Sequence, residues 1–157
     1  MPRSVRFLWV GKLKEPFFRD AAGHYLAKLK PLLPFEESVV RDAAGKLPPG
    51  EKSERECRAL LEAMSPKDFI ICLDERGQEL ASRQLADKLR SWTEDPNTRP
   101  CFVVGGAFGL NEAVRGRARF VWSLGRMTLP HELARVVALE QVYRAAAILK
   151  GIPYHHD

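Results

Sequence analysis

Residues 101–110 read CFVVGGAFGL, a run of apolar side chains that ends in a glycine loop. A second short run, FIICL, occupies residues 69–73 and is apolar at every position. Runs of this kind are typical of strands that are buried on both faces, as in parallel sheets. The two runs therefore predict the centre of an α/β fold.

The segments on either side of these runs alternate between the patterns of strands and helices. We predict further strands over residues 4–10, 35–41 and 120–124. Helices are predicted over residues 15–30, 53–64, 82–92 and 130–150, with a short one after Asn111. This alternation predicts a single domain over residues 1–157, with a mainly parallel sheet and helices on both sides.

Polar side chains mark where some of these helices are predicted to begin. Ser53 and Glu56 match the S-x-x-E capping box, and Ser82 is a candidate cap for the helix that follows it. The Gly- and Pro-rich residues 43–52 and the polar residues 74–81 are predicted to be loops.

The bulk composition fits one cytoplasmic domain. The chain has 157 residues, of which 45% are hydrophobic, and a formal net charge of +5. A mildly basic surface suits an anionic partner such as RNA, although many basic proteins bind none. The three cysteines, Cys57, Cys72 and Cys101, are widely spaced, which favours buried thiols in a reducing compartment. The N-terminus has charges throughout and does not resemble a signal peptide, and no run is long enough to span a membrane.

The pair His131-Glu132 looks like the start of the zinc motif H-E-x-x-H. The second histidine of that motif belongs four residues later, where this chain has Arg135. We therefore expect no metal site. Pro130 is instead predicted to occupy the first helical position, where its missing N–H is not needed, with Thr128 as the cap.

The glycine loop, GGAFGLNE at residues 105–112, is a candidate ligand site because loops at the carboxyl ends of parallel strands bind ligands. Its G-G-x-x-G spacing differs from the dinucleotide fingerprint, and a purely structural turn is an equal alternative. Two other strand ends, at Leu73-Asp74 and at residues 124–129, are expected at the same edge. Together the three could wall a pocket for an adenine-containing ligand.

The helix predicted over residues 130–150 is apolar round most of its circumference, with Leu133, Val136, Leu139 and Val142 on different sides. A helix with this pattern must be buried on more than one side. In a chain of this size we expect one of those sides to contact a second subunit.

Four segments in this order, LDERGQ, VVGGAFGL, LGRMTLPHELARVVALEQVYRA and a terminal PYHHD, together resemble the RlmH family, also called YbeA-like. The resemblance covers essentially the whole chain. It implies a SPOUT-superfamily methyltransferase whose α/β fold contains a deep C-terminal trefoil knot. It also implies a homodimer that uses S-adenosylmethionine to methylate N3 of pseudouridine 1915 in 23S rRNA of the ribosome.

The resemblance further implies the residues of the site. Those expected to hold the cofactor are Leu73, Gly105, Leu124, Gly125, Arg126, Met127, Thr128 and Leu129. The terminal Tyr154 and His155 are expected to lie beside the cofactor and to act on the substrate, and Arg135 is expected to position it.

Several roles stay open at this level. His155 and His131 are both candidates for a general base because histidine titrates near neutrality. Arg126, Arg135 and Arg144 are candidates for holding RNA phosphate, or else for ordinary ion pairs. A non-catalytic RNA-binding ribosome factor is the main alternative function. A nucleotide-dependent oxidoreductase is a weaker one, because no acidic residue ends the strand after the glycine loop to hold a ribose.

Overall fold

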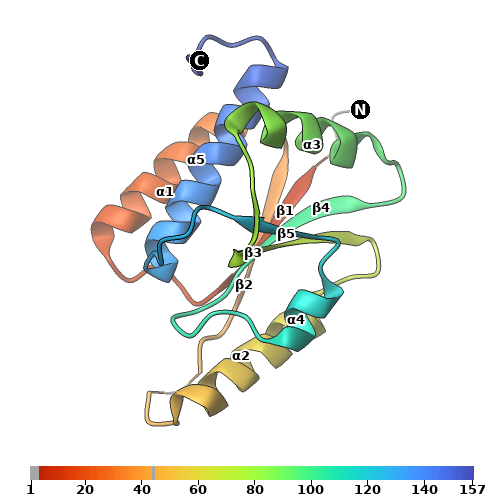
Figure 1. Ribbon diagram of the computed structural model, residues 1–157. Helices are drawn as coiled ribbons and strands as arrows, with labels where there is room; N and C mark the ends of the chain where they lie inside the picture. Colours follow the sequence, from red (N-terminus) through yellow and green to blue (C-terminus); the bar gives the residue numbers. More distant parts are fainter. Residues whose placement is uncertain (1–3, 44) are drawn as a thin grey trace.

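The computed structural model describes residues 4–43 and 45–157, and it confirms the predicted α/β fold (Figure 1). One five-stranded sheet runs in the order β2-β1-β4-β3-β5, and all four of its strand pairs are parallel. The strands are β1 (Val5–Val10), β2 (Phe35–Val40), β3 (Asp68–Glu79), β4 (Arg99–Val104) and β5 (Phe120–Ser123). Because every pair is parallel, the carboxyl ends of all five strands point to one edge.

Helices cover both faces of this sheet, as predicted (Figure 1). Three of them pack together on one face: α1 (Pro16–Leu29), α3 (Ser82–Glu94) and α5 (His131–Leu149). The other face carries α2 (Pro49–Ala63) and the short α4 (Glu112–Arg117). Within the described residues no helix is both long and apolar enough to cross a membrane.

Strand β1 explains why the sheet has two cores. Phe7 and Trp9 point into the core beneath α1, α3 and α5, whereas Leu8 and Val10 point into the core beneath α2 and α4. None of these four side chains is more than 2% exposed. Burying one such side chain contributes about 1.5–3 kcal/mol, so a strand that is apolar at every position is stable only between two layers.

The polar stretch after FIICL is not the predicted loop. Strand β3 continues through it to Glu79, and after a shift in register Gln78 pairs with Trp122 of β5. Gly77 lies so close to β5 that an added Cβ would be 2.4 Å from the carbonyl oxygen of Val121. The loop prediction is wrong because backbone pairing with a distant strand, and not a hydrophobic pattern, holds these residues extended.

Two predicted helix starts are also wrong. Helix α2 begins at Pro49, so Ser53 lies within it, and Glu56 is buried and accepts a hydrogen bond from the amide of Ala43 at 3.1 Å. Ser82 is the first residue of α3, not its cap, and its hydroxyl donates to the Gln141 side chain at 2.8 Å.

The predicted cap of α4 is confirmed. The side chain of Asn111 accepts a hydrogen bond from the amide of Val114 at 3.0 Å. The knot depends on how the chain is threaded and not on strand order, and it stays a prediction.

Candidate active site

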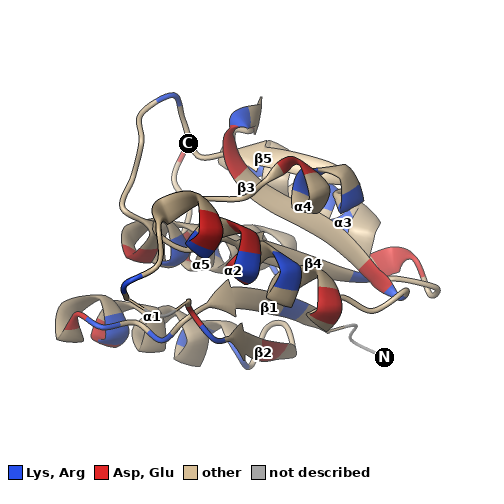
Figure 2. Cartoon of the chain, turned by 90° about the horizontal axis from the view of Figure 1, so that it is seen from below, with Lys and Arg blue, Asp and Glu red and all other residues tan. Residues whose placement is uncertain are grey.

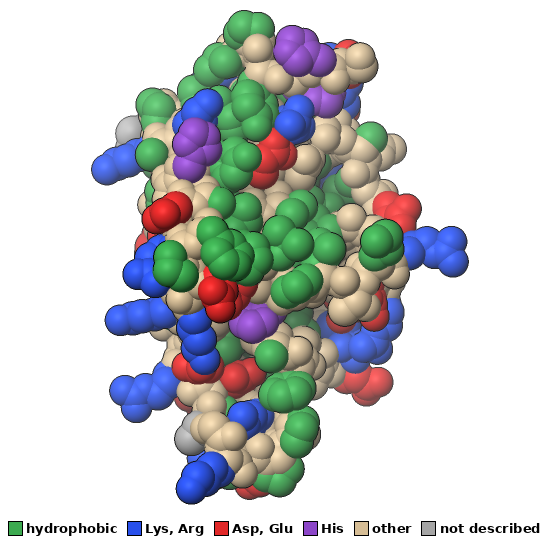
Figure 3. Space-filling view, turned by 90° about the vertical axis from the view of Figure 1, so that its left-hand side faces the viewer, with side chains coloured by type: hydrophobic (Ala, Val, Ile, Leu, Met, Phe, Trp, Pro, Cys, Tyr) green, Lys and Arg blue, Asp and Glu red, His purple; other side chains and the backbone are tan. Residues whose placement is uncertain are grey.

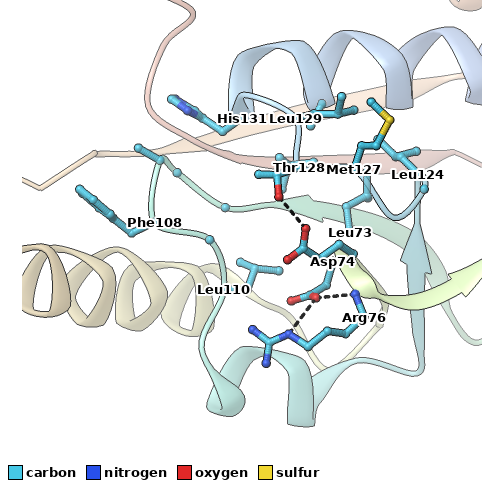
Figure 4. Close-up of a pocket in the computed structure, with 18 residues that line it drawn as sticks. Leu73, Asp74, Arg76, Phe108, Leu110, Leu124, Met127, Thr128, Leu129 and His131 are labelled. Carbon is cyan, nitrogen blue, oxygen red and sulfur yellow. Dashed lines mark hydrogen bonds and ion pairs between the residues drawn. The ribbon is translucent and has the colours of Figure 1, made fainter.

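A cavity of about 340 Å³ opens at the sheet edge where β3, β4 and β5 end (Figure 4). Three segments wall it: residues 73–76 of β3, the glycine loop after β4, and the loop between β5 and α5. The prediction that these three strand ends form one pocket is confirmed. His131 and Ala134 at the start of α5 complete the lining.

Most of the residues expected to hold a cofactor line this cavity. They are Leu73, Gly105, Leu124, Gly125, Met127, Thr128 and Leu129. Arg126 does not line it, and its side chain is exposed. Thr128 does not cap α5 as predicted, since Pro130 occupies the cap position and the Thr128 hydroxyl donates to Glu75 Oε2 at 3.0 Å.

The glycine loop is shaped by its own tight packing. Gly109 has a φ of +76° and its amide donates to the carbonyl of Gly106 at 3.0 Å. A Cβ on Gly105 would lie 2.8 Å from the carbonyl oxygen of Gly109, and one on Gly106 would lie 2.6 Å from Glu56 Oε1. Gly105 and Gly106 are therefore needed for the turn itself.

The polar wall of the cavity comes from the residues directly after FIICL. Asp74 accepts a hydrogen bond from the amide of Arg76 at 2.9 Å, and its carboxylate lies 3.4 Å from the guanidinium groups of both Arg76 and Arg115 (Figure 4). Glu75 accepts from Thr128 across the cavity mouth. Sequence reasoning missed Glu75, although its position after a buried strand was the signal that could have found it.

Phe108 is a second lining residue that sequence reasoning missed. Its ring lies on the glycine loop and is 48% exposed, and Lys52 lies 6.0 Å from its centre (Figure 4). A large exposed aromatic side chain in a loop at a strand end was visible in the sequence, but only the structure places it at a cavity.

Arg135 does not have the exposed position that a substrate contact needs. The residue is only 4% exposed, and Arg135 Nη1 donates to the carbonyl of Gly11 at 2.7 Å. Its guanidinium also lies 5.0 Å from the ring centre of Trp9. Burial lowers the pKa of Arg135 to about 10, which still leaves it charged at neutral pH. Arg135 ties α5 to the end of β1, and its role in positioning the substrate stays a prediction.

The terminal residues do not lie beside the cavity of their own chain. They follow the end of α5 at Leu149, and no residue after Ala134 lines the cavity. Tyr154 packs edge-on against Tyr143, at 4.6 Å between ring centres, and donates to Glu140 at 2.8 Å. His155 Nδ1 lies 3.1 Å from Arg144 Nη1. The structure therefore does not bring the tail to the cavity within one chain, and the expected place of Tyr154 and His155 beside the cofactor stays a prediction.

The family model described as "Predicted SPOUT methyltransferase" matches residues 4–155 of the chain. The chain belongs to this family. No group of three His, Cys, Asp or Glu side chains is placed to hold a metal ion in the part of the chain that the structure describes.

Relatives and solved structures agree with this assignment. A protein of Maridesulfovibrio salexigens named Ribosomal RNA large subunit methyltransferase H is 55% identical over 98% of both chains. A protein of Lawsonia intracellularis with the same name is 44% identical over 98% of both chains.

Among solved structures, a "probable methyltransferase" of Bordetella pertussis Tohama I has a TM-score of 0.56 at 18% identity and covers 92% of this chain and 95% of its own. A Legionella pneumophila methyltransferase structure in complex with SAM has a TM-score of 0.51 at 14% identity, and the match covers 92% of this chain and 67% of that one. These two structures share the fold.

Proposed function

We propose that this chain transfers a methyl group from S-adenosylmethionine to N3 of pseudouridine 1915 in 23S rRNA, acting on assembled ribosomes. The observation that carries the proposal is the cavity at the strand ends, in a chain that matches relatives named for large-subunit ribosomal RNA over nearly its whole length. A non-catalytic ribosome factor would need no such cavity. We further infer that residues 1–157 act as one catalytic domain in the cytoplasm.

The residues of the cavity suit an adenine-containing cofactor. Its volume falls within the range of roughly 300–1,000 Å³ that is usual for small-molecule sites. Leu73, Leu124 and Leu129 offer apolar surface for a purine ring, and the backbone of the glycine loop offers amides and carbonyls. Asp74 and Glu75 are acceptors for ribose hydroxyls or for a cationic group.

The proposed reaction demands little from the protein beyond alignment. The bound cofactor supplies an activated methyl group, and the ring N–H of the pseudouridine must lose its proton to accept it. Charge is neutralised as the methyl group moves, so the transfer needs no metal, and we expect activity to survive treatment with EDTA. Positioning and exclusion of water then account for most of the rate. His131 is the histidine of this chain that lines the cavity, and it can hold the departing proton there.

A homodimer through α5 follows from the apolar side chains left on its outer side. Leu133, Val137 and Ile148 are spaced along one face of α5 and are only partly buried in the single chain. Phe17 on α1 and Met127 beside the cavity are 62% and 81% exposed. Figure 3 shows hydrophobic side chains gathered across the middle of the face that carries α1. Exposed apolar patches of this kind mark contacts with a partner.

The dimer would also place the tail at a cavity. If two α5 helices pack antiparallel about a two-fold axis, the end of one lies beside the start of the other. Tyr154 and His155 of each chain would then reach the cavity of the partner. Neither Tyr154 nor His155 lines the cavity of its own chain, which supports this arrangement over one that acts within a single chain. His155 keeps its predicted role as a base only under this arrangement.

In the view of Figure 2, Lys and Arg are interspersed with Asp and Glu along the helices, and the net charge of +5 by itself does not identify the substrate. The substrate must therefore be tested directly. Ribosomes from a strain that lacks this protein would be incubated with the enzyme and labelled S-adenosylmethionine, and the methyl group located by mass spectrometry. One methyl group on N3 of that pseudouridine is the expected result. A methyl group on another base, on a ribose or on no RNA at all would contradict the proposal.

A further inference from the structure

The two carboxylates in the cavity wall differ in how their charge is balanced. Asp74 has cationic groups of Arg76 and Arg115 at 3.4 Å. Glu75 has only the neutral hydroxyl of Thr128 as a hydrogen-bond partner, and among the described residues it forms no ion pair. The negative charge of Glu75 is therefore uncompensated at the mouth of the cavity.

The cofactor and its product differ in charge by one unit. S-Adenosylmethionine carries a positive sulfonium, which becomes a neutral thioether in S-adenosylhomocysteine when the methyl group leaves. Their adenine, ribose and amino-acid groups are otherwise the same. A cavity that recognises only those shared groups binds both compounds equally and is inhibited by its own product, whereas a nearby negative charge favours the cationic form.

We propose that Glu75 is a specificity-determining residue that makes the cavity prefer the cationic cofactor over the neutral product. This inference rests on the proposed cofactor and not on the identity of the RNA. A sphere with the volume of the cavity would be about 9 Å across, which is close to the screening length of about 8 Å at physiological ionic strength. A charge held in the cavity therefore lies within reach of the Glu75 carboxylate.

Exposure limits the size of this effect. Glu75 is an exposed side chain, so solvent weakens its attraction to a bound cation. We expect Glu75 to raise the ratio of affinities for S-adenosylmethionine over S-adenosylhomocysteine by about three- to tenfold. Such a ratio shifts occupancy of the cavity towards the cofactor when cofactor and product are present at equal concentrations.

The variant Glu75→Gln separates charge from shape. Its side-chain amide oxygen can still accept the hydrogen bond from Thr128, so only the charge is removed. Calorimetry would measure three ligands: S-adenosylmethionine, S-adenosylhomocysteine and sinefungin, which has a cationic amine in place of the sulfonium methyl group. Glu79→Gln is the matched control, because Glu79 is an exposed glutamate on the same strand that does not line the cavity.

We expect Glu75→Gln to weaken the binding of S-adenosylmethionine and sinefungin about three- to tenfold and to leave the affinity for S-adenosylhomocysteine nearly unchanged. Thr128→Val, which removes the hydrogen bond but keeps the charge, should preserve the ratio, and high salt should reduce it only when Glu75 is present. Equal weakening of all three ligands, or no change in any, overturns the inference while leaving the proposed cofactor in place. A wild-type protein that binds no S-adenosylmethionine would overturn both.

Discussion

Two regions of α5 are built from different chemistry. At its start, His131 and Ala134 face an open cavity whose lining is largely backbone and uncharged side chains. Near its middle, Glu140 accepts hydrogen bonds from Arg144 at 2.6 Å and from Tyr154 at 2.8 Å. The first region leaves space for a ligand, and the second holds the last residues of the chain in place. The difference shows that one helix can carry two parts of a site that do not meet within a single chain.

The pKa shifts at the tail end indicate a structural clasp. Burial acts to raise the pKa of Glu140, but hydrogen bonds from Arg144 and Tyr154 outweigh it and lower the pKa. Burial and the hydrogen bond to Glu140 both raise the pKa of Tyr154, which stays a neutral donor at physiological pH. The Tyr154 ring also lies 4.7 Å from the Arg144 guanidinium, which adds a further contact to this clasp.

Deleting residues 154–157 should have the largest effect, because it removes the last residues of the chain and leaves the residues that line the cavity unchanged. We expect methyl transfer to fall by about a hundredfold or more, as for loss of a general base, while calorimetry shows S-adenosylmethionine affinity nearly unchanged. A truncated enzyme that methylates ribosomes at the wild-type rate would show that the tail has no part in the reaction.

The same variant can test whether the tail acts across the dimer. Truncated subunits would be mixed and refolded with Gly105→Val subunits, which keep the tail, and assayed at a cofactor concentration too low to fill the Gly105→Val cavity. Restored activity requires the tail of one subunit to serve the cavity of the other. A mixture that stays inactive, although mixed dimers form, would contradict the arrangement.

Val137→Lys should next test the outer side of α5. Val137 is only partly buried in the single chain, so a lysine there should leave a folded monomer. Val142→Lys is the matched comparison: Val142 is 0% exposed, and an unpaired buried charge costs about 3–5 kcal/mol, so that variant should unfold. Light scattering and thermal unfolding check both. A dimeric Val137→Lys protein would place the interface elsewhere.

Gly105→Val should have a smaller effect, which is to weaken binding of the cofactor in the cavity. The added side chain would collide with the backbone of Gly109 and displace the glycine loop, so we expect S-adenosylmethionine affinity to fall about tenfold, or about 1.4 kcal/mol. Gly116→Val on α4 is the control, because a Cβ there meets nothing within 4 Å. Unchanged affinity in a folded Gly105→Val protein would show that the loop does not hold the cofactor.

The smallest effect concerns the last residue of the tail. Hydrogen bonds from Arg83, at 2.6 and 2.7 Å, lower the pKa of Asp157 to about 2. Because the pKa of Asp157 is depressed, the contact stabilises the docked tail at pH values above the ordinary pKa of about 3.8. This stabilisation is lost as the pH falls towards 2.

Titration of the Asp157 carboxyl by NMR would check this. We expect a midpoint near 2 in the wild type and a return towards the ordinary value in Arg83→Gln. Arg58→Gln, which breaks an exposed pair with Glu54, should leave the midpoint where it is. A wild-type midpoint equal to that of Arg83→Gln would show that the tail is not docked in this way.

The parts of the cavity that sequence analysis could reach share one property: their signal is local. FIICL and CFVV are apolar at every position, which predicts strands between two layers, and parallel strands bring their carboxyl ends together. The same reasoning could not find the extension of β3, because Gln78 and Glu79 are held extended by pairing with β5 more than forty residues later. A polar strand of that kind has no pattern of its own.

Sequence by itself determined the order of elements, the parallel sheet, the edge at which the cavity opens and most of the residues that line it, because hydrophobic runs and turn residues act over a few positions. Only the tertiary structure decided which charged groups face that cavity. No sequence pattern predicts the surroundings of Arg135, yet its guanidinium is buried against the carbonyl of Gly11, 124 residues earlier. The last residues of the chain likewise do not line the cavity at the start of α5. Burial and long-range hydrogen bonds set these roles, and both depend on residues that are distant in the chain.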